Sequence, residues 1–228
     1  MLESNIQERY AKHSLSRLCQ GDLFVQLPLN LFVSNSEGGA VVEYTFPYAV
    51  LVSQDCDLEQ EFRARLKQET AAANGTPPPP FSSFQPNVLV LPAFRDELLH
   101  QGIHLKEIYG VTAPKLDRDI WKRVVSNNDE RYHTLEEARS LNIPQLVIDF
   151  KTYLSVPKEN LEKLLADHYV ATINELFREN LAIRFANYMS RIALPELAST
   201  SATSSVNPLP NAASPSHSNT TPENPSAI

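Results

Sequence analysis

The chain of 228 residues contains few glycines, few cysteines and no long apolar run. No apolar run approaches the roughly 20 residues that a membrane-spanning helix needs, so we expect a soluble protein that does not contact a membrane. The six glycines include only one adjacent pair, which leaves no glycine-rich loop to hold a phosphate. The Walker, GxGxxG, GxSxG, HExxH and CxxC motifs are also missing, and the enzyme classes that depend on them are excluded.

The first ten residues, MLESNIQERY, have neither the basic segment nor the apolar segment of a secretory signal. The sequence therefore predicts a cytoplasmic protein. In that compartment two cysteines are more often free thiols than a disulfide, and we expect both Cys19 and Cys56 to be free.

The charged residues are divided unequally along the chain. There are 20 Lys and Arg against 27 Asp and Glu, and this acidic balance argues against indiscriminate binding of polyanions. The last 33 residues contain no Lys or Arg, and 21 of them are serine, threonine, asparagine or proline. Such a composition cannot bury enough apolar surface to offset the entropy of ordering, so residues 196–228 are predicted to be a disordered tail. All basic residues therefore lie in the body, where a local basic surface can still form.

Short β-rich runs at close spacing are typical of a small barrel or sandwich and not of alternating strands and helices. The expected strands cover residues 21–27, 31–33, 41–46, 48–53, 88–91, 131–135, 146–156 and 169–173. Two of these runs, 49–52 and 88–91, are apolar throughout, which predicts buried, central strands.

Apolar residues at helical spacing predict helices over residues 6–18, 58–69, 96–102, 117–125 and 175–193, and Asn174 is the expected N-cap of the last. We therefore predict an α+β fold: a strongly bent SH3-like β-barrel with helical insertions, a long C-terminal helix and a disordered tail. The expected domains are an N-terminal helix in residues 1–20, the barrel in residues 21–195 with an insertion at 58–86 and the helix 175–193, and the tail at 196–228.

Four segments, in their order along the chain, resemble the PemK/MazF-like family of SH3-like barrels, in a divergent and uncharacterised bacterial branch. They are GDLF at 21–24, PYAVLVS at 47–53, VLVLP at 88–92 and LVID at 146–149. Toxin members of this family cut single-stranded RNA, so the resemblance implies a metal-independent endoribonuclease without a cofactor. The family usually carries an Arg directly before the proline at position 47, where this chain has Phe46, and a Thr or Ser after the next buried strand, where Pro92 is followed by Ala93.

These departures favour a non-catalytic interaction module of a bacterial toxin-antitoxin or phage-defence system. We expect a protein partner. Two further expected partners are single-stranded RNA and a second copy of the chain, which would form a homodimer. The alternative is a divergent endoribonuclease of the PemK/MazF type.

The candidate catalytic residues for that alternative are Asp55, Asp57 and Arg95. Cleavage without a metal needs a base for the 2′-hydroxyl and a cation for the developing phosphorane charge, and Arg95 could supply the cation. Alternation along a strand would place Asp55 and Asp57 on one face, as an acid pair for a partner's Arg, for Mg²⁺ or for a reacting hydroxyl. The other interpretation is that Cys56 packs inward and the two aspartates cap a helix that begins at Leu58.

The candidate nucleic-acid-binding residues are Arg118, Lys122, Arg123, Arg131 and Tyr132. Cations and an aromatic ring on one surface are the minimum for binding a single strand. The same pattern is typical of an ordinary amphipathic helix followed by a strand, and four acidic residues dilute the charge.

His100 and His104 have the i, i+4 spacing of zinc ligands on a helix. Gly102 interrupts that helix, and no Cys or Asp at a typical spacing completes a set of ligands. We therefore expect a solvated pair of histidines and no metal site.

Overall fold

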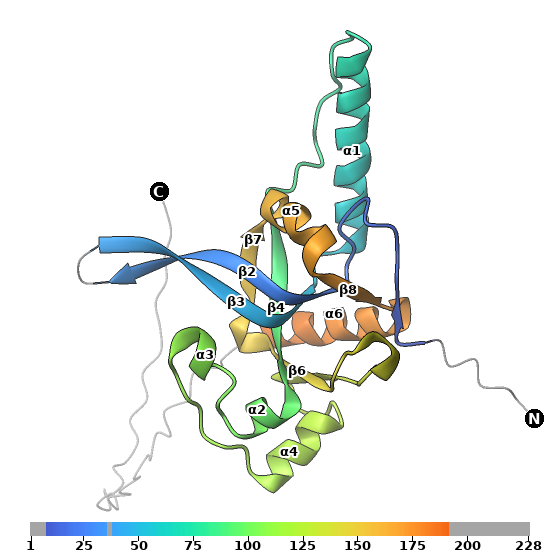
Figure 1. The fold of residues 1–228 in the computed structure, drawn as a ribbon. Helices are drawn as coiled ribbons and strands as arrows, with labels where there is room; N and C mark the ends of the chain where they lie inside the picture. Colours follow the sequence, from blue (N-terminus) through green and yellow to red (C-terminus); the bar gives the residue numbers. More distant parts are fainter. Residues whose placement is uncertain (1–7, 36–37, 192–228) are drawn as a thin grey trace, which may run out of the picture. The chain divides into compact units, whose positions relative to one another are not determined.

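The structure is a computed structural model that describes residues 8–35 and 38–191 (Figure 1). The strands are β1 (Tyr10–Ala11), β2 (Asp22–Asn35), β3 (Gly38–Leu51), β4 (Asn87–Arg95), β5 (Tyr132–Leu135), β6 (Leu146–Asp149), β7 (Leu154–Pro157) and β8 (Tyr169–Ile173). The α-helices are α1 (Asp55–Ala73), α2 (Asp96–His100), α3 (Lys106–Tyr109), α4 (Arg118–Val125), α5 (Lys158–His168) and α6 (Glu175–Met189). Two short 3-10 helices follow β5 and β6, at Arg139–Leu141 and Phe150–Thr152.

The strands form one antiparallel, strongly curled sheet that makes half of a barrel, in the order β1-β8-β2-β3-β4-β6-β5. Strand β4 pairs with two different neighbours on the same edge. Its first half, Asn87–Val90, pairs with β7, and its last part, Ala93–Arg95, pairs with β6. Pro92 lies where one neighbour ends and the other begins, so its missing N–H costs no hydrogen bond to either.

The central part of the sheet is buried on both faces, and this explains its uninterrupted apolar runs. One face carries Phe24, Leu51 and Val90 and is covered by residues of α5 and of the α2–α4 segment. The other face carries Val50 and Leu91 and is covered by α6. The prediction of central strands at 49–52 and 88–91 is therefore confirmed, because neither face of these strands has to be polar.

Strands β2 and β3 form one long hairpin, where the sequence indicated four short strands. Within β2, only Asp22–Phe24 pair with β8, so Pro28 lies beyond the stretch where β8 pairs with β2. Gln26 has a positive φ of 49° and, with Pro47, is left out of the register of pairs. The pairs on either side keep the same register, so neither strand has an inserted residue here, and the outer part of the hairpin projects from the rest of the sheet (Figure 1).

The N-terminal helix predicted over residues 6–18 is wrong for the part that the structure describes. Residues 8–20 form β1 and a series of turns. Tyr10 pairs with Ile173 of β8, and the amide of Asn174 donates to the carbonyl of Arg9. Pairing with a distant strand therefore overrides the helical spacing of the apolar residues.

The C-terminal helix α6 begins at the predicted residue, Glu175, and ends at Met189. Asn174 occupies the N-cap position, but its side chain donates to the carbonyl of Glu8 and does not cap the helix. The predicted strand 146–156 is interrupted by a 3-10 turn after Asp149. The disordered tail predicted at 196–228 lies outside the described residues. Within the described residues, no helix combines the length and the apolar character needed to cross a bilayer.

Candidate functional site

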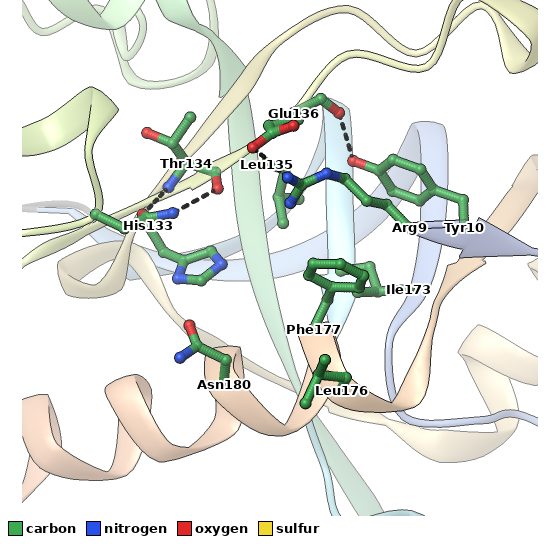
Figure 2. A pocket seen from close by; sticks show the side chains of 11 residues that line it. Arg9, Tyr10, His133, Thr134, Leu135, Glu136, Ile173, Leu176, Phe177 and Asn180 are labelled. Carbon is green, nitrogen blue, oxygen red and sulfur yellow. Dashed lines mark hydrogen bonds and ion pairs between the residues drawn. The ribbon is translucent and has the colours of Figure 1, made fainter. Parts of the chain in front are cut away.

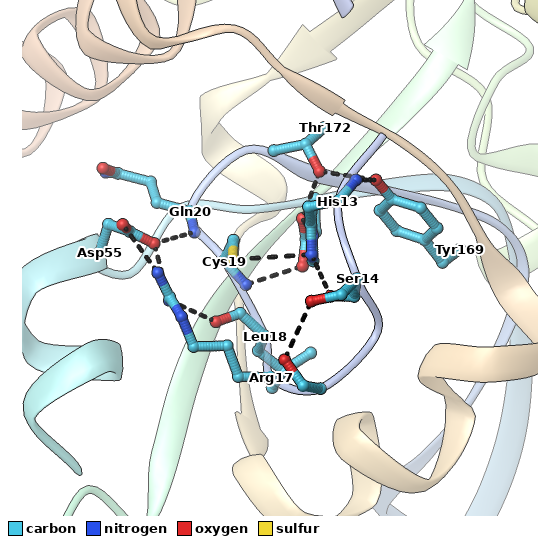
Figure 3. Close-up of polar contacts among 11 residues, drawn as sticks. His13, Ser14, Arg17, Leu18, Cys19, Gln20, Asp55, Tyr169 and Thr172 are labelled. Carbon is cyan, nitrogen blue, oxygen red and sulfur yellow. Dashed lines mark hydrogen bonds and ion pairs between the residues drawn. The ribbon is translucent and has the colours of Figure 1, made fainter. Parts of the chain in front are cut away.

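The predicted acid pair lies in the first turn of α1 and not on a strand, because the helix begins at Asp55, three residues earlier than expected. Asp55 accepts hydrogen bonds from Arg17 Nη1 at 3.1 Å, from Arg17 Nη2 at 3.3 Å and from the amide of Gln20 at 3.1 Å (Figure 3). Burial raises the pKa of Asp55, but these hydrogen bonds outweigh it and the net pKa is lowered. Cys56 is exposed, so the expectation that it packs inward is wrong, whereas the expectation that both cysteines are free is confirmed.

Arg95 lies at the other end of the sheet from this pair. Leu51, the last residue of β3, is paired with Val90, and Arg95 is five residues further along β4. At about 3.3 Å per residue, Arg95 is roughly 17 Å from the end of β3, after which the acid pair follows. The structure therefore does not bring Asp55, Asp57 and Arg95 together into one site.

The predicted nucleic-acid-binding residues are mostly engaged within the protein. Arg131 forms a two-point ion pair with the buried carboxylate of Asp149, and Tyr132 is itself buried. Arg123 lies 3.8 Å from Asp129, and Lys122 lies 4.0 Å from Asp119 in the same helix. Asp117 accepts from the amides of Asp119 and Ile120 as the N-cap of α4. Among the five, only Arg118 is an exposed cation without an acidic partner in the described part of the chain.

A different cavity, of about 700 Å³, is lined in part by one of the predicted site residues, Arg95. It lies between the middle of the β2–β3 hairpin, the end of β4 and the segment that joins α2 to α3. Its polar wall consists of Gln26, Thr45, Arg95, His104, Lys106 and Glu107, and its apolar wall of Pro47, Phe94, Leu98, Ile103 and Ile108. We call this cavity the Arg95 pocket.

The two cations of the Arg95 pocket are placed by short helices. Arg95 ends β4 and stands at the N-cap position of α2, while Lys106 is the first residue of α3. The turn between these helices requires Gly102, which has a φ of +75° and where a Cβ atom would lie 2.1 Å from the carbonyl oxygen of Ala113. Both cations are exposed, and neither has an acidic partner within 4 Å among the described residues.

His104 forms a buried part of the pocket wall, so the expectation that it is solvated is wrong. Its ring packs edge-on against Phe94, with 4.9 Å between the centroids, and neither ring nitrogen has a hydrogen-bond partner in the described structure. Burial lowers the pKa of His104, so the ring is neutral at pH 7. The other histidine of the pair, His100, stacks on Trp121 at 4.5 Å, which separates the two imidazoles into different environments.

Aromatic side chains stand next to the pocket. Tyr109, at the end of α3, is 37% exposed and contacts the rings of Tyr44 and Phe46, with centroid distances of 5.5 and 6.4 Å. Two free cations and a carboxylate thus line one hollow, and the partly exposed Tyr109 follows the lining residue Ile108 in the chain. Such an arrangement suits a ligand that has phosphate groups and flat rings.

A second cavity, of about 330 Å³, lies between α6 and β5 (Figure 2). Its lining includes the buried His133, whose Nδ1 has no partner in the described structure and whose pKa burial lowers to about 3. The cation of this cavity, Arg9, is already paired with Glu136 and lies 4.6 Å above the ring of Phe177. Because this charge is neutralised, the second cavity is less suited to an anionic ligand than the Arg95 pocket.

The chain matches no known protein-family model, and searches among curated proteins and among solved structures also find no match. The PemK/MazF-like resemblance therefore stays a prediction from four short segments. Sequence reasoning found Arg95 but missed Lys106 and Glu107, which are ordinary charged residues of a short helix. The signal that could have pointed to them is Gly102, since an interrupted helix turns the following residues back towards the end of β4.

Proposed function

We propose that this chain is a non-catalytic module that binds single-stranded RNA in the Arg95 pocket. The observation that carries the proposal is the pair of exposed cations, Arg95 and Lys106, on one hollow without acidic partners in the described structure. Cations that follow the phosphates, together with an aromatic ring on which a base can stack, are what single-strand binding requires. Tyr109 and Tyr44 offer such rings: each is adjacent in sequence to a residue that lines the pocket, and the two rings contact one another.

The proposal is consistent with the resemblance predicted from the sequence. Pro47 lines the Arg95 pocket, and the residue before it, Phe46, stands where PemK/MazF-like proteins usually carry an Arg. Phe46 is fully buried, so an Arg could not replace it without a large cost, and Arg95 brings a cation to the same hollow from the neighbouring strand. The SH3-like barrel, the toxin-antitoxin or phage-defence setting, the protein partner and the homodimer remain predictions that accompany this proposal.

The lack of catalysis is proposed because the two predicted acids and the histidine of the pocket are badly placed to move a proton. Asp55 and Asp57 lie at the other end of β4, and both ring nitrogens of His104 are buried within the wall. One observation favours the alternative, an endoribonuclease: Glu107 lines the pocket with Arg95 and Lys106, and a carboxylate base beside cations is what metal-free cleavage needs.

Binding can be tested by fluorescence anisotropy with a labelled single-stranded RNA. The double variant Arg95→Ala, Lys106→Ala should weaken binding at least about tenfold. It should also make the dependence of affinity on salt concentration less steep, by the amount expected for the loss of about two phosphate contacts. The matched control, Arg118→Ala, Lys122→Ala, removes two cations of α4 and should leave affinity within about twofold, because those side chains lie outside the pocket. If wild type does not bind RNA, or if only the control loses affinity, the proposal is wrong.

Cleavage is tested separately with the same RNA in the presence of a chelator. The proposal expects intact RNA with wild type and with Glu107→Gln. Products ending in a 2′,3′-cyclic phosphate, formed by wild type but not by Glu107→Gln, would establish the ribonuclease instead.

A further inference from the structure

The loop that leads into β2 brings His13 and Cys19 (Figure 3) close to Asp22, the first residue of β2. Nε2 of His13 lies 2.8 Å from Oδ1 of Asp22, and Nδ1 of the same ring lies 3.9 Å from Sγ of Cys19. One ligand atom from each residue can be chosen so that all three lie within 4.8 Å of one another. Imidazole nitrogen, thiolate sulfur and carboxylate oxygen are the three ligand types that zinc takes in proteins.

Two of these residues are held in a tight turn. The amide of Asp22 donates to the carbonyl of Cys19 at 3.1 Å, and the amide of Cys19 donates to Oδ2 of Asp22 at 2.7 Å. Gly21 closes the turn with a φ of +90°, and a Cβ atom there would lie 3.0 Å from the carbonyl oxygen of Ile173. The two ligands are thus separated by two residues, the spacing found in C-x₂-C zinc turns, with an aspartate as the second ligand.

Strand β8 supports the cluster from the side. The hydroxyl of Thr172 donates to Oδ1 of Asp22 at 2.7 Å, and the hydroxyl of Tyr169 lies 2.9 Å from that of Thr172. Tyr169 also accepts from the amide of His13 at 3.3 Å, and its ring meets the imidazole edge-on. Such outer hydrogen bonds orient ligands in metal sites, and here they join a loop to a strand 150 residues away.

The charges that the cluster would carry also favour a cation at this place. Asp22 is fully buried, Cys19 is 9% exposed, and the side chain of His13 is 24% exposed. Binding of Zn²⁺ would release the thiol proton to solvent and leave a thiolate and a carboxylate, whose two negative charges the ion neutralises. The exposed edge of His13 gives the ion a route in and a place for water as a fourth ligand.

The same three residue types also form the nucleophile, base and orienting acid of cysteine hydrolases. A hydrolase needs room for a substrate at the thiol. Five cavities in the described part of the chain are lined by residues other than Cys19, His13 and Asp22, which argues for a structural role.

We propose that His13, Cys19 and Asp22 bind one zinc ion through a ring nitrogen, the thiolate sulfur and a carboxylate oxygen. The ion fastens the loop before β2 to the sheet. This site is separate from the Arg95 pocket, and neither proposal depends on the other.

The test uses the untagged full-length protein, stripped of metal by dialysis against a chelator and titrated with Co²⁺. We expect saturation at one equivalent, with the near-ultraviolet absorption of a cobalt–thiolate bond, and displacement by Zn²⁺. Cys19→Ser should lose that absorption and weaken binding at least about tenfold. Cys56→Ser is the matched control, since this exposed thiol lies outside the cluster, and it should bind like wild type.

Because Cys19 is buried, folding of its variant is checked by circular dichroism without metal. His13→Ala changes a partly exposed ligand and should also lose tight binding; because it also removes a hydrogen bond to the buried Asp22, its folding without metal is checked by circular dichroism in the same way. Zn²⁺ should raise the melting temperature of wild type and of Cys56→Ser only. Absence of one-to-one binding by wild type, or binding that survives in Cys19→Ser and His13→Ala, would overturn the proposal.

Discussion

Replacing Arg131 by methionine should destabilise the protein by about 3 kcal/mol without weakening RNA binding. The guanidinium donates from Nε to Oδ1 of Asp149 at 2.8 Å and from Nη2 to Oδ2 at 2.5 Å. Asp149 is fully buried, and its pairing raises the pKa of Arg131. Without Arg131, the remaining donor to this carboxylate in the described structure is the amide of Lys151 at 3.0 Å.

The magnitude follows from leaving a buried charge with too few partners. Removing one member of a buried ion pair costs about 3–5 kcal/mol, and the 36% exposure of the Arg131 side chain places this pair at the lower end. Such a loss is a large part of the roughly 5–15 kcal/mol by which domains are stable. Replacing both members, as Arg131→Met with Asp149→Leu, should recover much of the loss because no charge stays buried.

Urea unfolding followed by the fluorescence of Trp121, the single tryptophan, measures the effect. The control is Arg123→Met, which removes a half-exposed pair with 3.8 Å between its atoms and should cost less than about 1 kcal/mol. RNA affinity of the folded Arg131→Met protein is measured in parallel. A loss of stability below about 1 kcal/mol, or normal stability with lost RNA binding, would refute the assignment of Arg131 to the core.

Two further predictions concern pH. Asp55→Asn should lower the free energy of unfolding by about 1 kcal/mol at pH 7 and not at all at low pH. The reason is that the lowered pKa of Asp55 stabilises the folded protein at pH 7, and this stability is lost as the pH falls through that pKa. An equal loss at pH 3 would contradict this. His133 stays neutral when folded, since burial first and nearby Arg184 second lower its pKa to about 3, whereas an unfolded histidine takes a proton near pH 6.5. Acidification between these values should therefore lower the free energy of unfolding by up to about 1.4 kcal/mol per pH unit. In His133→Leu, the free energy of unfolding measured in urea should depend less steeply on pH; an unchanged dependence would argue against a neutral, buried ring.

The buried strands were predictable because their signal is local. A strand that is covered on both faces has no position where a polar residue is favoured, so the run Ala49–Val52 reveals its place without any knowledge of its neighbours. The start of α6 and the extent of α4 could be read in the same way, from apolar spacing.

The N-terminal segment shows where local signals fail. Its apolar spacing fits a helix, yet Tyr10 contributes more by pairing with β8 and by burying its ring against that strand. The partner, Ile173, is more than 160 residues away, so no window of sequence contains the competing interaction. Arg131 is a second example. Its sequence neighbours indicate a charge that is available to a nucleic acid, but its ion-pair partner, Asp149, lies 18 residues further along the chain.

For the candidate sites, the sequence by itself determined the inventory: few glycines, two free cysteines, and cations confined to the body. It also pointed to Arg95 as a cation at the end of a buried strand. Which charges remain free, and which groups meet, depended on the tertiary structure alone. Lys106 joins Arg95 through a turn at Gly102, and Thr172 reaches Asp22 across 150 residues, because pairing and packing depend on distances in space that residue order does not record.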